Sequence, residues 1–287
     1  FPFRGIQNYL PLLPGVVQQN GKLYIRGGRA GEVGYLLDGV PVTNRFFNSE
    51  GVTLIPEAID QIELYTGAYE AEHGGANAGL VQSKMRTGGE KFEYSSGVES
   101  DDFAKPGKEF LGTTALGYRN IVGTVGGSLP YEVKMFLAAG HQYLRNRQSM
   151  FLEPFRREGL VTDQLGPLPS GTPLPGPVEF KRNYLPNNWY TRNTLQGNFF
   201  RELGRDLSVR IIGSYSFEKN PEGGNWPSAL QNYFRQKRNM MNETKTFFGA
   251  LRASQSLTSK ISYRLTLSLL NRSSRLFDPD FEDNWQL

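Results

Sequence analysis

The stretch that decides the fold is KLYIRGGRAGEVGYLLDGVPV, residues 22–42, together with IPEAIDQIELYTGAYEAEHGGANAGLVQSKMRTGG at residues 55–89. Its glycines separate short runs of β-forming residues, which indicates a small domain with tight turns. We find no nucleophile, base and orienting group that belong together in the chain, so no catalytic residues are expected. What this small domain does depends on the sequence that follows it.

Composition excludes several kinds of site. The 32 basic residues nearly balance the 28 acidic ones, for a net charge of +4, so a nucleic-acid partner is not expected. The absence of cysteine rules out disulfides and thiolate zinc sites. His73 and His141 lie far apart and outside any H-E-x-x-H pattern, so we expect neither a metal site nor a cofactor.

Hydropathy argues against membrane-spanning helices. No apolar run approaches the roughly 18 residues that such a helix needs, and the longest candidate, Val133–Gly140, contains Lys134. The first residues show no secretory signal pattern. Aromatic residues make up 13% of the chain, glycines number 33, and mean hydropathy is -0.47. These values suit a soluble all-β protein or an outer-membrane barrel with a polar lumen.

From Phe92 onward, apolar and polar residues alternate. The clearest runs are Tyr131–Tyr143, Leu207–Phe217 and Ile261–Leu269, with weaker ones at Thr191–Leu203 and Thr246–Leu257. Alternation predicts strands with one apolar face. Each run has about ten residues or more, the length of a tilted membrane-spanning strand and roughly twice that of a globular one.

The connections between these strands alternate in length. Long polar segments are expected at 145–188, 218–244 and from 271 onward, and tight turns at Leu129-Pro130, Gly204–Asp206 and Thr258–Lys260. Short turns on one side and long loops on the other are typical of outer-membrane barrels. Within 111–129 the alternation changes parity near Tyr118–Ile121, which predicts a bulge.

Counting a first strand at Phe92–Val98 gives seven strands. Bacterial single-chain barrels close with even numbers, and an open edge cannot face lipid. We therefore expect a piece of a longer protein, or partner strands on another chain.

The opening segment contains several ordered motifs. It resembles the plug domain of TonB-dependent outer-membrane receptors, and the GGSLPYEVKMFLAAGHQYLRNR region is similar to the branch with an N-terminal peptidase-regulatory-like domain. The plug motifs are Ile25-Arg26-Gly27, Tyr35, Leu37-Asp38-Gly39-Val40-Pro41-Val42, Ile55-Pro56, Ile59, Ile62-Glu63-Leu64, Gly67, His73-Gly74, Ala78-Gly79 and Val81.

The resemblance implies a mostly β fold in the bacterial outer membrane. Residues 1–89 would form a small α+β plug domain lacking its N-terminal part. Residues 90–287 would form the N-terminal part, about seven strands, of a large antiparallel transmembrane β-barrel. The implied partners are a TonB-type energy-coupling protein, outer-membrane lipids, an unknown solute, and a surface lipoprotein or other outer-membrane protein.

The implied function is import of a bulky, scarce solute, with the plug gating the lumen. One alternative is a non-transport scaffold in an outer-membrane secretion or surface-lipoprotein complex. A third interpretation, a soluble β-sandwich enzyme, predicts extraction without detergent.

The resemblance also implies gating residues. Arg26 matches a plug-latch arginine that would face acidic residues of the barrel beyond Leu287. We assign Glu63 to the same group of latch and gating residues, although we expect its side chain to pair locally rather than to bind solute. A second family arginine is replaced by Thr66. The remaining plug-motif residues are Gly27, Asp38, Gly39, Gly67, Gly74 and Gly79.

Two other motifs are weak. GGRAGEVG loosely resembles a dinucleotide loop, but strand-forming residues follow it where a helix is required. The carboxylates of 278–283 have calcium-like spacing without the glycine of an EF-hand loop, which favours a solvated loop.

Overall fold

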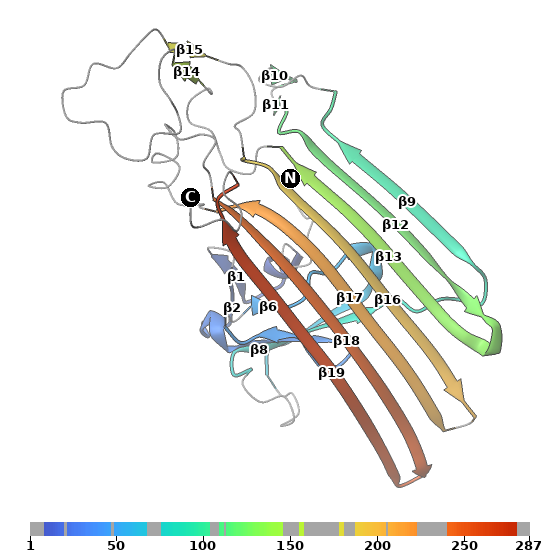
Figure 1. Cartoon of the computed structure of the whole chain (residues 1–287). Helices are drawn as coiled ribbons and strands as arrows, with labels where there is room; N and C mark the ends of the chain where they lie inside the picture. The colour runs from blue at the N-terminus through green and yellow to red at the C-terminus, as the bar shows by residue number, and fades with distance from the viewer. Residues whose placement is uncertain are drawn as a thin grey trace, which may run out of the picture.

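A computed structural model describes residues 9–19, 22–46, 49–67, 76–103, 109–111, 113–145, 155–157, 178–180, 187–204, 206–222 and 240–279. A large antiparallel sheet of long strands forms one layer, and a small mixed sheet lies against one of its faces (Figure 1). None of the helices in these ranges has the length and hydropathy to cross a membrane.

The small sheet has four strands in the order β4-β3-β8-β7. β3 and β8 are parallel, and the other two pairs are antiparallel. β1 and β2 form a separate antiparallel hairpin, as do β5 and β6. The helical elements among the described residues of this domain are short 3-10 turns. Its elements are η1 (Leu10–Leu12), β1 (Val16–Gln19), β2 (Lys22–Ile25), η2 (Ala30–Glu32), β3 (Val33–Leu37), β4 (Val40–Pro41), β5 (Thr43–Asn44), β6 (Ser49–Glu50), η3 (Pro56–Ala58), β7 (Ile59–Tyr65) and β8 (Gly79–Met85).

The large sheet has seven antiparallel strands, as the alternation predicts, in the order β19-β18-β17-β16-β13-β12-β9. Its members are β9 (Glu93–Ser100), β12 (Tyr118–Leu129), β13 (Val133–Leu144), β16 (Tyr190–Leu203), β17 (Leu207–Pro221), β18 (Met241–Thr258) and β19 (Ile261–Phe277), with η4 (Pro130–Glu132) in the β12–β13 turn. Two short hairpins lie in the long connections: β10 (Glu109–Phe110) with β11 (Thr113–Thr114), and β14 (Phe155–Arg157) with β15 (Val178–Phe180).

Alternation along each strand assigns its two faces. In β17 and β18, the even-numbered Ile212, Phe248 and Ala250 are buried in one cluster with the core of the small domain. The odd-numbered Ile211 and Leu251 remain exposed on the opposite face. The predicted apolar face of the strands is therefore the outer face, and the small domain covers the inner one.

The expected bulge at Tyr118–Ile121 is wrong, because β12 pairs with both β9 and β13 without a register shift. Tyr118 and Val122 are buried on the inner face, and Val122 packs with Ile55 and Ala58 of the small domain. Apolar residues therefore occur on both faces of this strand. The mixed pattern arises because the small domain covers the inner face of β12, and not because the alternation changes parity.

Three long strands also extend beyond their predicted ends. β17 continues to Pro221, β18 begins at Met241 and β19 continues to Phe277, so the loop expected from residue 271 begins later. Charged residues at these ends, including Glu218 and Lys219, hid the alternation. The three predicted tight turns lie where expected.

Candidate functional site

The contact between the small domain and the long sheet centres on a two-residue turn, Asp38-Gly39. This turn joins β3 to β4, and both residues have positive φ, 49° and 76°. Asp-Gly is favoured in such hairpin turns because glycine and aspartate tolerate this conformation. The turn points at the seven-stranded sheet, which we call the wall. A Cβ on Gly39 would lie 2.8 Å from Nη1 of Arg252 on β18.

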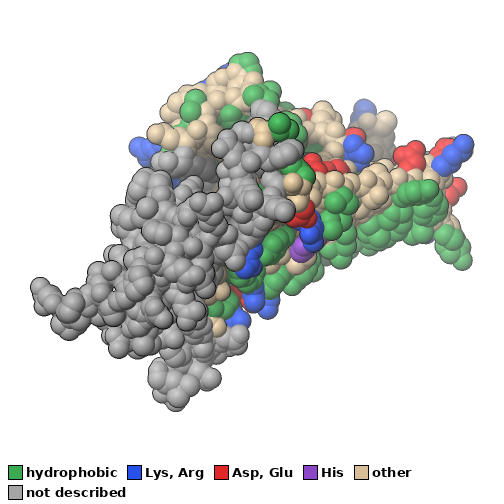
Figure 2. Space-filling view, turned by 90° about the horizontal axis from the view of Figure 1, so that it is seen from above, with side chains coloured by type: hydrophobic (Ala, Val, Ile, Leu, Met, Phe, Trp, Pro, Cys, Tyr) green, Lys and Arg blue, Asp and Glu red, His purple; other side chains and the backbone are tan. Residues whose placement is uncertain are grey.

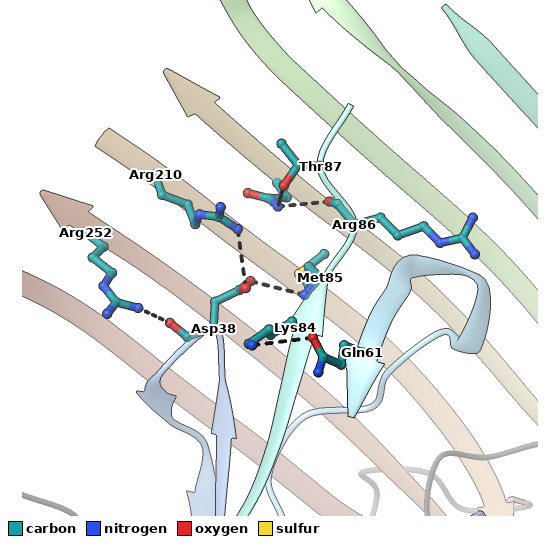
Figure 3. A network of polar contacts seen from close by, with 9 residues as sticks. Asp38, Gln61, Lys84, Met85, Arg86, Thr87, Arg210 and Arg252 are labelled. Atoms are coloured by element: carbon teal, nitrogen blue, oxygen red, sulfur yellow. Dashed lines mark hydrogen bonds and ion pairs between the residues drawn. The ribbon is translucent and has the colours of Figure 1, made fainter. Parts of the chain in front are cut away.

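Asp38 joins the small domain to two wall arginines (Figure 3). Its Oδ1 lies 3.3 Å from Nη1 of Arg210 on β17, and its backbone carbonyl accepts a hydrogen bond from Arg252. The backbone N–H of Met85 donates to Oδ2 at 3.4 Å. Burial raises the pKa of the Asp38 carboxyl, although Arg210, the Met85 N–H and Arg252 oppose this shift. The carboxylate is therefore held by contacts that span both domains.

A cavity of 360 Å³ lies beside this contact. Lys84 and Asp60 line it from the small domain, and Ser208 and Ser254 line it from the wall. Its lining is polar on both sides, so water can replace protein partners there if the domains separate.

Two amides on β16 form a second set of contacts. Gln196 is fully buried; its Oε1 accepts from the Ile55 N–H at 2.9 Å, and its Nε2 donates to the Thr53 carbonyl at 3.0 Å. Asn198, also fully buried, donates to the Arg86 carbonyl at 2.9 Å. These side chains hold the small domain through three backbone groups.

A smaller cavity of 180 Å³ opens next to the Gln196 contact, toward the long connections. Glu57 and Tyr9 line it from the small domain, and Glu99, Gln142 and Arg192 line it from the wall. Arg192 donates to Gln142 at 2.9 Å.

In the part of the chain that the structure describes, the polar contacts of the two predicted gating residues are with the small domain and not with the long strands, although Lys84, the partner of Glu63, lines the 360 Å³ cavity. Arg26 has φ 47°, its N–H donates to the Gly15 carbonyl at 2.8 Å, and it has no acidic partner among the residues that the structure describes. Glu63 pairs locally with Lys84 at 2.6 Å and accepts from the Tyr65 hydroxyl at 2.6 Å. The Lys84 hydrogen bond, followed by that of Tyr65, lowers the pKa of Glu63. Their role in gating stays a prediction.

The plug-motif glycines serve local geometry. Gly27 has φ 76° in the turn after β2, and Gly67 has φ 159° after β7. Gly79 lies against Ile25, whose Cδ1 would be 2.8 Å from an added Cβ. Gly74 lies outside the described residues.

The sequence did not identify the wall residues of the site. The polar face of the alternating strands predicts polar side chains at the inner-face positions, which include Gln196, Asn198, Arg210 and Arg252. The alternation does not indicate which of these side chains contact the small domain. Among the described residues, no group of three His, Cys, Asp or Glu side chains could hold a metal ion.

Comparison with known proteins agrees with this architecture. The family profile described as "TonB-dependent Receptor Plug Domain" matches residues 2–81. The TonB-dependent transporter Oar of Myxococcus xanthus is 27% identical over 92 residues, which are 32% of this chain and 9% of Oar.

Solved structures show the same fold at low sequence identity. The siderophore receptor PirA of Pseudomonas aeruginosa superposes with a TM-score of 0.62 at 14% identity, covering 96% of this chain and 39% of PirA. The outer-membrane transporter YddB of Escherichia coli gives 0.58 at 13% identity, covering 92% of this chain and 36% of YddB. The chain thus spans well under half the length of these relatives.

The architecture is that of a plugged outer-membrane barrel: a small mixed sheet docked on the lumen face of long antiparallel strands. Residues 2–81 match the TonB-dependent receptor plug domain, a family whose members lie in the bacterial outer membrane and are not enzymes. The chain as a whole has the fold of the corresponding part of the solved outer-membrane receptors and transporters. The division at residues 89 and 90 and the peptidase-regulatory branch stay predictions.

Proposed function

We propose that the protein belongs to an energy-coupled importer, in which a TonB-type protein moves the plug and opens a path for a bulky, scarce solute. The observation that carries this proposal is the way the plug is docked. Polar side chains of the wall, Gln196, Asn198, Arg210 and Arg252, hold the backbone and the Asp38 turn of the plug.

Such contacts suit a reversible closure. A hydrogen bond of this kind contributes only about 0.5–1.5 kcal/mol net, because water offers replacement partners. The 360 Å³ polar cavity beside Asp38 already provides space for water at this interface. We infer that Asp38 with Arg210 and Arg252 forms the plug latch here, and that Arg26 and Glu63 contribute to gating from within the plug.

The chain is tightly packed where it passes from the proposed plug domain to the first long strand. Gly88 lies where the chain passes from plug to wall, and a Cβ there would be 2.1 Å from the Met135 carbonyl oxygen and 2.5 Å from that of Gly127. The proposed boundary, 1–89 for the plug and 90–287 for the incomplete barrel, lies one residue further along the chain, after Gly89.

Cysteine labelling in energised cells tests the proposal without knowledge of the solute. Leu54 is only 7% exposed against the wall, and the chain has no cysteine of its own. In the full-length protein, L54C should react with a membrane-impermeant maleimide only when TonB is present and the proton-motive force is intact. Equal labelling in cells lacking TonB would contradict energy coupling.

A lock provides the matched control. A Cβ on Gly140 would lie 3.6 Å from Cγ1 of Ile55, which brings I55C and G140C close to disulfide geometry. Oxidation of I55C/G140C should abolish the labelling of L54C, and reduction should restore it. Full physiological activity of the locked protein in a stable outer-membrane complex would instead support the scaffold alternative.

A further inference from the structure

A cluster of charged side chains lies on the outer face of β17, β18 and β19, near the long connections. We call Lys219, Glu243, Lys245 and Arg275 the outer cluster. All four are odd-numbered, whereas the even-numbered Arg210 contacts the plug. Lys219, Glu243 and Arg275 lie directly opposite one another across the three strands, and Lys245 lies two residues from Glu243 on the same face. The outer cluster therefore faces away from the plug, on the side that the barrel presents to lipid.

One carboxylate organises the outer cluster. Lys219 Nζ lies 3.1 Å and Arg275 Nη2 lies 3.7 Å from Glu243 Oε2, and Lys245 Nζ lies 3.3 Å from Oε1. The Glu243 side chain is 8% exposed, but those of Lys245 and Arg275 are 55% and 46% exposed. Glu243 can neutralise only one of the three cations that share it, and the cationic groups face outward.

Aromatic rings surround these cations. Lys219 lies over Phe217 and Phe277 at 5.8 and 5.5 Å, Lys245 over Phe217 at 5.8 Å, and Arg275 over Phe277 at 5.0 Å. Toward the short turns, the same face carries the exposed Leu265, Leu267 and Leu269. On this face the apolar band is therefore followed, toward the long connections, by a level at which cations and aromatic rings are mixed. Such a level is typical of the depth where lipid tails meet headgroups.

The free energy of placing charged side chains on the lipid face also favours a position of the outer cluster at the membrane interface. A lysine or arginine on the lipid face costs about 2–4 kcal/mol at the membrane midplane but close to nothing near the interface. Figure 2 shows a band of hydrophobic side chains along the sheet, with lysine, arginine and histidine side chains at the end of this band that lies next to the grey residues. Long loops lie on the extracellular side of outer-membrane barrels, so the outer cluster lies at the outer leaflet.

We propose that Lys219, Lys245 and Arg275 bind the phosphate groups of lipid A, the phosphorylated glycolipid of the outer leaflet. Ammonium and guanidinium groups form charge-assisted hydrogen bonds with phosphate. Glu243 positions the three cations, and the leucine face below them accommodates the acyl chains.

Native mass spectrometry of the full-length protein in detergent, titrated with bisphosphorylated lipid A, tests this site. The K219Q/K245Q variant should bind lipid A roughly tenfold more weakly than the wild type. K134Q/K260Q removes the same charge at the short-turn end and should bind normally. Wild-type protein should also bind dephosphorylated lipid A more weakly.

Three results would overturn the proposal. These are equal affinity of K219Q/K245Q and wild type, equal binding of the dephosphorylated lipid, or displacement of lipid A by millimolar inorganic phosphate, which would indicate a site for soluble anions. Heat-modifiable electrophoretic mobility of each variant shows that its barrel is folded.

Discussion

Replacing Gln196 with alanine should release one edge of the plug from the wall. Gln196 is fully buried and makes hydrogen bonds of 2.9 and 3.0 Å with the backbone of Ile55 and Thr53. Its removal leaves one buried donor and one buried acceptor without these bonds, at about 1–3 kcal/mol each. Water from the adjoining 180 Å³ cavity can reach both groups, so the lower end applies and the expected loss is about 2 kcal/mol.

Hydrogen exchange followed by mass spectrometry measures how often this edge of the plug opens. Two kcal/mol raises the population of the open state about 30-fold, and amide exchange in a peptide spanning residues 50–58 should accelerate by the same factor. Gln142→Ala is the matched control, because that glutamine faces the same lumen but bonds Arg192. It should leave the exchange of this peptide unchanged.

The outcome that refutes the reasoning is unchanged protection of Ile55 in Gln196→Ala with a folded barrel. In that case the apolar contact of Ile55 and Ala58 with Phe136 and Ala138 would hold this edge without the amide.

Three further substitutions test other contacts. Asp38→Asn removes the carboxylate that pairs with Arg210 and leaves the hydrogen bond from Arg252 to the backbone carbonyl in place. Since Arg210 is 24% exposed and burial already disfavours the Asp38 charge, exchange at 36–41 should reflect a loss of only about 1–2 kcal/mol; Asp60→Asn, in the same cavity, should have no effect. The pKa of Glu63 is lowered from 4.5, so its stabilisation is present above that value and lost as pH falls through the lowered pKa. The difference in urea midpoint between wild type and Glu63→Gln should accordingly shrink on acidification, and a constant difference would contradict the Lys84 pairing. Gly88→Ala forces a Cβ against backbone atoms and should abolish heat-modifiable barrel folding; Gly89→Ala, whose Cβ would meet only the Lys91 carbonyl at 3.9 Å, should fold normally.

The strand pattern of the wall was readable from sequence because alternation reports directly which face is apolar. Ile261–Leu269 and Leu207–Phe217 were recognisable for this reason. The ends of β17 and β19 were not, because Lys219 and Arg275 lie on the outer face and have the polarity of a loop. β12 was misread for the opposite reason: Tyr118 and Val122 are buried on its inner face, where Val122 packs against Ile55 and Ala58 of the plug, so apolar residues occur on both faces.

Only part of the candidate site could be predicted from the sequence. The Asp38-Gly39 turn follows from local chain geometry, which short sequences encode. Its partners Arg210 and Arg252 lie 172 and 214 residues further along. That Arg210 reaches the carboxylate of Asp38 and Arg252 reaches its backbone carbonyl depends on the register of the strands and on how the plug docks. Neither is set by residues near Asp38.

The pairing of the plug strands sets an order of mechanical failure. β1 and β2 are an antiparallel hairpin in which Val16 pairs with Ile25, so tension between the two ends of the hairpin opens its bonds one after another. β3 and β8 run parallel, with Val33 beside Gly79 and Leu37 beside Ser83. Tension applied at the start of β3, with the end of β8 anchored near Gly88, loads all of those bonds at once in shear. A pull from the N-terminal side would therefore unzip the hairpin and then stall at β3 and β8, which makes the plug a tether that lengthens in steps.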